Sequence, residues 1–397
     1  MSRPAGAALA LIAPLALGLL LNFVAPIGLL LTQAWEEHEL PGAWPRTATA
    51  LRAWRGSELP DERLTALLVE ELRSSYVAGT LSRVANRLNY DQPGSRSLLF
   101  YTARQLARLG SADRGSHSSL DLLRQIDSRW GNAATWATLR HAAGPFTSFY
   151  LLAAVDRRLD PHDNIVAVPA AQAVFLRVFA RTFVISAVVT LLCAALGYPV
   201  AYTLATLPQR LASVLLIVLL LPFWTSVLVR STAWMVLLQD QGMVNQFLLQ
   251  VGLAARPLRL IYNRTGVFIA MTHVLLPYFV LPLYSVMRAI PAGSLRAAHS
   301  LGAPPGYAFW RVYLPQTMPG VTAGGLIVFI LALGYYLTPA LLGGAGDQMI
   351  GYFIAYYTNE ALNWGMAAAL SLILLTTTVG LVALYGRLAG MRELALR

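Results

Sequence analysis

The sequence predicts an all-α integral membrane protein with six membrane-spanning helices and a large, mostly helical insertion between the first and the second. Of the 397 residues, 56% are hydrophobic and 12% are charged, whereas a soluble domain carries roughly 25% charged residues. Fifteen of the 19 acidic residues fall within residues 36–163, and several stretches elsewhere run for more than twenty residues without a charge. Such stretches can cross a hydrocarbon core, which takes about 20 apolar residues.

Uncharged stretches place the six predicted spans along the chain. The first lies within residues 4–35, none of which is charged. A cleaved signal peptide has an apolar region of about 7–15 residues, so this longer stretch predicts a retained anchor. The other five spans are predicted within the ranges 182–209, 211–234, 265–287, 312–346 and 361–386.

Residues 36–170 are predicted to form a separate domain. Apolar residues recur at helical spacing within 65–72 and again within 98–109. Pro93-Gly94 and the polar loop at 110–116 are typical of connections between helices. With about 130 residues, the insertion is large enough for a small core of its own.

The distribution of arginine predicts that both termini are cytoplasmic. The short cytoplasmic loops and termini would carry one acidic residue, Glu393, and eight basic residues: Arg3, Arg210, Arg288, Arg296, Arg311, Arg387, Arg392 and Arg397. This is the positive-inside pattern, although Arg177 and Arg181, just outside the second span, count against it. The insertion then lies outside, because long loops cross largely regardless of charge. We therefore attribute the net charge of +11 mainly to arginines that orient the helices in the membrane, and we expect no nucleic-acid partner.

Several function classes are excluded by composition. All 30 basic residues are arginine, which rules out a G-x-x-x-x-G-K-[ST] phosphate loop and a Schiff-base lysine. The single cysteine, Cys193, allows neither a disulfide nor a thiolate cluster within the chain. No H-E-x-x-H or G-x-S-x-G motif occurs. We therefore predict a non-catalytic protein without a metal site or a cofactor of its own.

Polar and aromatic residues in the spans are candidates for lining a transport path. Arg230, nineteen residues after Leu211, either faces a cavity or snorkels to the outer interface. His273 either lines the path or forms an interhelical hydrogen bond, and it has no acid or histidine at i+4 for a metal. A wider set could equally form an interfacial aromatic belt: Trp224, Thr225, Trp234, Tyr278, Tyr335, Tyr336 and Thr338. With Arg230 and His273, the predicted path comprises Trp224, Thr225, Tyr278 and Tyr336.

The loop at 290–315 predicts two short helices broken at Gly302. Glycine readily takes the left-handed conformation that a sharp turn needs. The first helix presents the small side chains of Ala297 and Ala298, and the second presents aromatic residues beside Arg311. Such a helical pair either docks into a groove of a cytoplasmic partner or simply connects two spans.

This loop resembles the E-A-A–x3–G loop of binding-protein-dependent ABC importer permeases. The family's glutamate falls on Arg296, and the matching positions are Ala297, Ala298, Gly302 and Leu314-Pro315. Residues 175–390 further resemble the polyamine (spermidine/putrescine) type of these permeases in four segments: Gly197–Tyr202, Leu221–Arg230, Tyr262–Arg264 and His273–Pro277.

The resemblance implies the type I ABC importer permease architecture in the bacterial inner membrane, with an anchor at 1–35, an outer domain at 36–170 and a permease core at 171–397. It also implies import of a small solute, a polyamine or related amine, delivered by a periplasmic binding protein. The implied partners are a second homologous permease subunit and separate ATPase subunits, which bind ATP and Mg. The ATPase-coupling surface would comprise Arg296, Ala297, Ala298, Gly302, Ala303, Leu314 and Pro315.

A membrane receptor whose outer domain binds a ligand is the alternative function. Only the tail from Arg387 to Arg397 follows the sixth predicted span, which would leave no signalling output domain. The permease is the preferred prediction.

Overall fold

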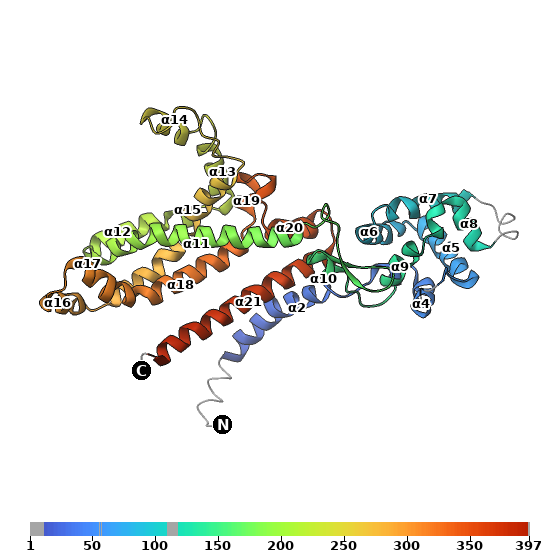
Figure 1. The fold of residues 1–397 in the computed structure, drawn as a ribbon, viewed down its shortest axis with the longest axis horizontal. Coiled ribbons are helices and arrows are strands. Elements are labelled where there is room, and N and C mark those ends of the chain that lie inside the picture. The colour runs from blue at the N-terminus through green and yellow to red at the C-terminus, as the bar shows by residue number, and fades with distance from the viewer. Residues whose placement is uncertain (1–11, 55, 57, 109–117, 396–397) are drawn as a thin grey trace, which may run out of the picture. The chain divides into compact units, whose positions relative to one another are not determined.

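The computed structural model of the chain describes residues 12–54, 56, 58–108 and 118–395. Most of these residues are helical, as predicted, and the described ranges contain one small unpredicted hairpin of two strands (Figure 1). The chain divides into two compact units, Met1–Val174 with Tyr357–Leu375 and Phe175–Tyr356 with Thr376–Arg397. The start of the first predicted span, residues 4–11, and the predicted polar loop at 110–116 lie outside the described residues.

Five helices in the described residues are long and apolar enough to cross a membrane. They are Ile12–Thr32, Phe175–Thr206, Arg264–Ala289, Pro305–Leu333 and Trp364–Arg387. These helices correspond to the predicted first, second, fourth, fifth and sixth spans, although the second begins before its predicted start at residue 182.

The third predicted span, at 211–234, is bent. Gln209–Trp224 and Val227–Leu237 are two helical segments bent by 97° against each other. Pro222 lies in a short 3-10 turn before the bend and cannot donate a backbone hydrogen bond. Ser226 then caps the new segment, because its Oγ accepts a hydrogen bond from the Val229 N–H at 3.2 Å. If the bent pair crosses as one, the described residues contain six candidate spans.

The predicted fifth span at 312–346 holds more than one helix. Helix α18 (Leu314–Leu333) ends at Gly334, and a separate helix α19 (Leu337–Leu342) follows. The composition stays apolar across this break, so an absence of charge could not reveal it.

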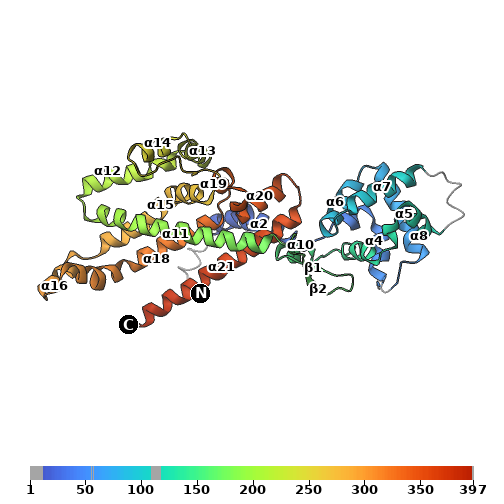
Figure 2. The same ribbon diagram turned by 45° about the horizontal axis from the view of Figure 1, so that its top comes forward.

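The first unit contains the first span, the cap and the beginning of the last long helix, where "cap" denotes residues 36–170. The span includes the π-turn η1 (Leu20–Val24) and α2 (Ala25–Thr32). The cap helices are α3 (Glu39–Ala43), α4 (Pro45–Ala53), α5 (Glu62–Val77), α6 (Leu81–Asp91), α7 (Ser95–Arg108), α8 (Ser119–Ile126), η3 (Ser128–Gly131), α9 (Ala133–His141) and α10 (Phe149–Ala154). Strands β1 (Arg157–Leu159) and β2 (Ile165–Ala167) pair antiparallel beside α10 (Figure 2).

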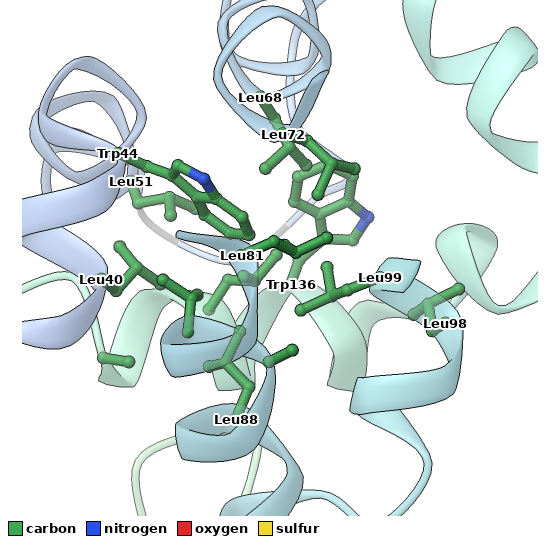
Figure 3. Packing of buried hydrophobic residues seen from close by; sticks show 14 of the residues in the cluster. Leu40, Trp44, Leu51, Leu68, Leu72, Leu81, Leu88, Leu98, Leu99 and Trp136 are labelled. Atoms are coloured by element: carbon green, nitrogen blue, oxygen red, sulfur yellow. The ribbon is translucent and has the colours of Figure 1, made fainter. Parts of the chain in front are cut away.

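The cap has its own hydrophobic core, as its length predicted. Trp44, Leu72 and Trp136 are fully buried together with leucines of α5, α6 and α7 (Figure 3). The buried indoles also satisfy their polar groups. Trp44 Nε1 donates to Ser75 Oγ at 3.0 Å, and Trp136 Nε1 donates to the Trp130 carbonyl at 2.9 Å. Buried polar groups that have hydrogen-bond partners are typical of a well-packed protein interior.

The second unit is built around three long helices. Its elements are α11 (Phe175–Thr206), α12 (Gln209–Leu220), η4 (Leu221–Trp224), α13 (Val227–Leu237), α14 (Met243–Gln250), α15 (Arg264–Ala289), α16 (Ala292–Ser300), α17 (Pro305–Ala308), η5 (Phe309–Tyr313), α18, α19, η6 (Ala345–Asp347) and most of α20 (Ile350–Asn359). Helix α21 (Trp364–Ala395) begins in the first unit. Helices α11, α15 and α18 pack on one another (Figure 1).

Glycine permits the closest approach within this bundle. A Cβ at Gly324 of α18 would lie 2.7 Å from the Phe279 carbonyl oxygen of α15, and one at Gly197 of α11 would lie 2.7 Å from the Phe279 ring. Small residues at helix contacts are the usual means of close packing in membranes, where helices gain little from hydrophobic burial.

Candidate functional site

Arg230 follows the bend in the third span, on a helix that packs against a second helix. Arg230 lies on α13, which packs against α19, and α19 packs in turn against α15. The side chain is half-buried, and its Nε and Nη1 are buried without a hydrogen-bond partner among the described residues. Unsatisfied donors of a charged group are costly in an apolar setting. The arrangement therefore favours a group that supplies acceptors.

Arg230, Trp234, His273 and Tyr335 form one cluster, called the Arg230 cluster below. Trp234 Nε1 donates to His273 Nδ1 at 3.2 Å, with ring centroids 5.3 Å apart. The guanidinium lies within electrostatic range of His273 and of the Tyr335 hydroxyl. Since α13, α15 and the segment before α19 each contribute, the cluster depends on how these helices pack.

The predicted path residues separate into two groups. Arg230 and His273 are brought together, and Tyr278 lies near Tyr335 with its ring edge-on to Phe223 at 4.9 Å. The others lie on exposed surface without a recorded hydrogen bond or ring contact to the cluster among the described residues: Trp224, Thr225 and Tyr336. Trp224 is 90% exposed.

Three residues of this region were outside the predicted path. Trp234 and Tyr335, which the sequence gave only in the wider candidate set, lie in the Arg230 cluster. Ser231, next to Arg230, joins α13 to α19 through a 2.9 Å hydrogen bond with Thr338. Tyr335 and Thr338 were both in the wider candidate set of the sequence, and the Tyr335 hydroxyl is hydrogen-bonded to Thr338.

The loop at 290–315 has the two-helix form that the sequence predicts. Helix α16 ends in a Schellman motif, because the Gly302 N–H donates to the His299 carbonyl and the Ala303 N–H to the Ala298 carbonyl, at 3.0 and 3.1 Å. Gly302 has a φ of 84°, which confirms the predicted left-handed conformation. A Cβ at this position would meet nothing within 4 Å. The turn therefore requires glycine for its backbone conformation and not for lack of space.

The tip of this loop exposes large apolar side chains. Leu301, Tyr307 and Trp310 are 88%, 58% and 66% exposed, respectively. Of the predicted coupling residues, Arg296, Ala297, Gly302 and Pro315 are exposed, and Ala298, Ala303 and Leu314 are half-buried. Exposed apolar side chains that gather on one loop are typical of an interaction surface.

The base of the loop is held rigidly. The Phe309 ring stacks on Tyr313 at 5.8 Å and meets Tyr198 and Tyr202 of α11 edge-on, at 6.1 and 6.0 Å. A force on the exposed tip would therefore be passed to α11 and α18.

A cavity of about 900 Å³ lies within the first unit. Its lining includes carboxylates and aromatic rings: Glu36, Glu37, Glu39, Glu360, Tyr90 and Trp364. Two of these carboxylates have ionic partners, since Glu36 lies 3.1 Å from His38 and Glu37 lies 2.6 Å from Arg87. Sequence reasoning did not find this cavity, because its walls come from segments far apart in the chain. The described residues hold no group of three or more His, Cys, Asp or Glu suited to a metal ion.

Comparison with known proteins gives consistent matches to transport permeases. Residues 194–389 match the family model described as binding-protein-dependent transport system inner membrane component. The chain is 37% identical over 210 residues to the spermidine/putrescine transport system permease protein PotB of Escherichia coli strain K12, covering 53% of this chain and 76% of the relative. It is 31% identical over 186 residues to the molybdenum transport system permease protein ModB of Mycobacterium bovis, covering 47% and 69%.

Among solved structures, a bacterial ABC transporter involved in the import of the acidic polysaccharide alginate aligns with a TM-score of 0.44 at 15% identity. That alignment covers 54% of this chain and 78% of the other.

Proposed function

The chain belongs to the family of binding-protein-dependent transport system inner membrane components, and from this premise we propose that the loop at 290–315 couples a separate ATPase to a solute path through the second unit. As a member of this family the chain is a non-catalytic, multi-pass permease subunit of an ABC importer in the inner membrane. The alternative of a membrane receptor is not favoured, because the relatives are transport permeases.

The Schellman turn at Gly302 carries the coupling proposal. It separates α16 from α17, and Leu301, Tyr307 and Trp310 are exposed beside it. An ATPase groove that buries these side chains would gain apolar contact area. Movement of the groove would then act on α18 directly and on α11 through Phe309.

The remaining partners follow from the family. We propose that both termini lie in the cytoplasm, that the bent third segment completes six crossings, and that a second homologous permease subunit encloses the path. The cap then lies on the outer side, where a binding protein would deliver the solute. Arg296 stands where the family has glutamate, so the charge of the facing ATPase groove is expected to differ.

An amine is the proposed class of solute. The relatives at 37% identity are named as spermidine/putrescine permeases, and the matched region includes the whole Arg230 cluster. The ATP and Mg that drive transport would be bound by the ATPase, and we propose no cofactor on this chain.

Two substitutions in the loop test the coupling. Gly302→Asp forces a side chain into the left-handed conformation, at a cost of roughly 1–2 kcal/mol, and Ala298→Trp adds bulk to the docking helix. Both variants should reach the membrane at near-normal levels but fail to couple ATP hydrolysis to uptake. Gly306→Ala is the matched control, because a Cβ there meets nothing within 4 Å and Gly306 has no positive φ.

Location is tested separately by cross-linking. Cysteines at Ala298 and Ala303, in a chain whose Cys193 is replaced, should cross-link to the ATPase in the assembled complex. Normal uptake by both bulky variants, together with no cross-link from either cysteine, would show that the loop is a plain connector.

A further inference from the structure

The cavity of about 900 Å³ in the first unit, called the cap cavity below, has the size of a small-molecule site. Ligand pockets in proteins typically enclose about 300–1,000 Å³. The walls come from residues within 29–39, 83–90 and 360–365, and from Tyr150, all of which belong to the first unit. Because the first of these segments ends the first span and begins the cap, the cavity lies where the cap joins that span.

The wall formed by residues 360–365 is held in place by local structure. Leu362 has a φ of 49°, a left-handed conformation that a bulky residue rarely adopts. Asn363 then caps α21, because its Oδ1 accepts a hydrogen bond from the Met366 N–H at 3.0 Å. A Cβ at Gly365 would lie 2.4 Å from the Tyr150 ring, so glycine allows α21 to begin directly against the cap. These contacts preform this wall of the cavity.

Negative charge is in excess in the lining of the cap cavity. Four carboxylates and two guanidinium groups line it, which gives a formal balance of −2 with His38 neutral: Glu36, Glu37, Glu39, Glu360, Arg83 and Arg87. Glu37 is already paired with Arg87 at 2.6 Å. Glu39 and Glu360, in contrast, form no ion pair among the described residues. These two carboxylates are therefore available to a cation.

Aromatic rings line the same cavity. Tyr90 and Trp364 are 44% and 43% exposed, respectively. The face of an aromatic ring attracts an ammonium group, and a ring also shields neighbouring methylene groups from water. An anion would be repelled by the excess of carboxylates. A metal ion is disfavoured as well, because the described residues hold no group of three or more His, Cys, Asp or Glu suited to one. The lining therefore fits an organic cation with an apolar chain.

We propose that the cap cavity binds a linear amine in which methylene groups join two or more ammonium groups. Glu39 and Glu360 pair with the ammonium groups, and the rings of Tyr90 and Trp364 cover the methylene chain. The choice of an amine rests on the proposed function of the chain as an amine importer. The walls within 29–39 and 83–90 lie outside the region at 194–389 that matches the family, so the site does not follow from family membership.

Protection of a cysteine in the cavity wall measures binding locally, apart from any solute path in the second unit. Cysteine replaces Ala361, which lines the cavity, in a chain with Cys193 replaced by serine. The assembled complex is treated with uncharged N-ethylmaleimide, without ATP or binding protein. Putrescine and spermidine should slow the labelling in a saturable manner. Butylamine has the carbon number of putrescine but one ammonium group, so it should protect at least about tenfold less well. Magnesium chloride at equal ionic strength should not protect.

A double variant tests the two carboxylates. Glu39→Gln/Glu360→Gln removes both negative charges and keeps the size of the side chains. It should raise the putrescine concentration that gives half protection by about ten- to a hundredfold, the usual effect of losing a hydrogen bond to a charged group. Glu70→Gln/Asp121→Asn is the matched control, because it removes two carboxylates from the exposed surface of the cap outside the cavity. This control has the same net charge and should leave half protection unchanged.

Several results would overturn the proposal. If Ala361→Cys does not react, Asn86→Cys on α6 is the second reporter, and no reaction at either position would show that the cavity is closed to solutes. No protection by putrescine or spermidine, equal protection by butylamine or magnesium chloride, or an unchanged half protection in Glu39→Gln/Glu360→Gln would also contradict it. Failure of the proposed function looks different, because the loop variants described above would then transport normally while protection in the cavity, measured without ATP, would be unaffected.

Discussion

The Glu37–Arg87 ion pair should hold the start of the cap to α6. Both side chains are buried, with Arg87 Nε 2.6 Å from Glu37 Oε2, and the guanidinium lies 4.1 Å over the Phe149 ring. Arg87→Met keeps most of the side-chain volume but leaves Glu37 without its partner. Removing one partner of a buried pair costs about 3–5 kcal/mol. Unfolding entropy of about 2.1 cal/mol/K per residue gives about 0.27 kcal/mol/K for a cap of roughly 130 residues, so its midpoint should fall by about 10–20 °C.

The pH dependence of the variant follows from the same burial. Desolvation already raises the pKa of Glu37 above its usual 4.5, despite the attraction of Arg87. Without Arg87 the pKa rises further, so the folded variant keeps a proton that the unfolded chain releases above about pH 4.5. The protonated carboxyl is tolerated, and stability is lost as the pH rises through the folded pKa. The deficit of Arg87→Met should therefore be smaller at pH 5 than at pH 8.

Hydrogen exchange of peptides from α5, α6 and α7 in the purified complex, followed against temperature, measures this midpoint. Glu70→Gln is the control, because Glu70 lies 2.8 Å from Arg46 at the exposed surface and Arg46 keeps Glu71 at 3.5 Å, so the midpoint should stay close to wild type. The double variant Glu37→Gln/Arg87→Met should recover part of the loss, since it leaves no unpaired buried charge. A shift of under about 3 °C for Arg87→Met would refute the reasoning that this pair fixes the cap.

Three further predictions concern the helices and the cap. Gly324→Ala should destabilise the purified permease by about 1–3 kcal/mol in thermal unfolding, because its Cβ would meet the Phe279 carbonyl at 2.7 Å. Gly325→Ala is the control and should be tolerated, because its Cβ lies 3.7 Å from Thr190. Equal stabilities of the two variants would contradict the packing argument. Replacing residues 40–160 with a short linker should weaken association of the binding protein in a pull-down while the ATPase still assembles; unchanged association would remove that role from the cap. Ser231→Ala should loosen α13 from α19 by removing the 2.9 Å bond to Thr338, seen as faster thiol labelling along α13, whereas an unchanged rate would show the contact to be dispensable.

Local and compositional features were predictable from the sequence. Uncharged stretches located the five long helices, because the charge of a side chain is itself what the hydrocarbon core excludes. The left-handed turn at Gly302 was predictable because a single residue type favours that backbone conformation. The core of the cap followed from the helical spacing of its apolar residues, which needs no knowledge of their partners.

Contacts between distant segments were not predictable in the same way. The bend at Ser226 depends on a helix N-cap and a proline turn inside an otherwise apolar stretch, so the absence of charge located this segment but not its bend. Arg230 and His273 were each singled out, but only the packing of α13, α19 and α15 brings them together with Tyr335, which the sequence gave only in the wider candidate set. The cavity lined by Glu37 and Glu360 likewise exists only when segments far apart in the chain meet.

One physical reason separates the features that were predictable from the sequence from those that were not. Membrane insertion and backbone conformation are decided residue by residue, by transfer free energies and by sterically allowed dihedral angles, and both are legible in the order of the amino acids. Which unpaired donor meets which neighbour is decided by the close packing of whole helices. A glycine such as Gly324 sets how near α18 approaches α15, and that distance exists only in the tertiary structure.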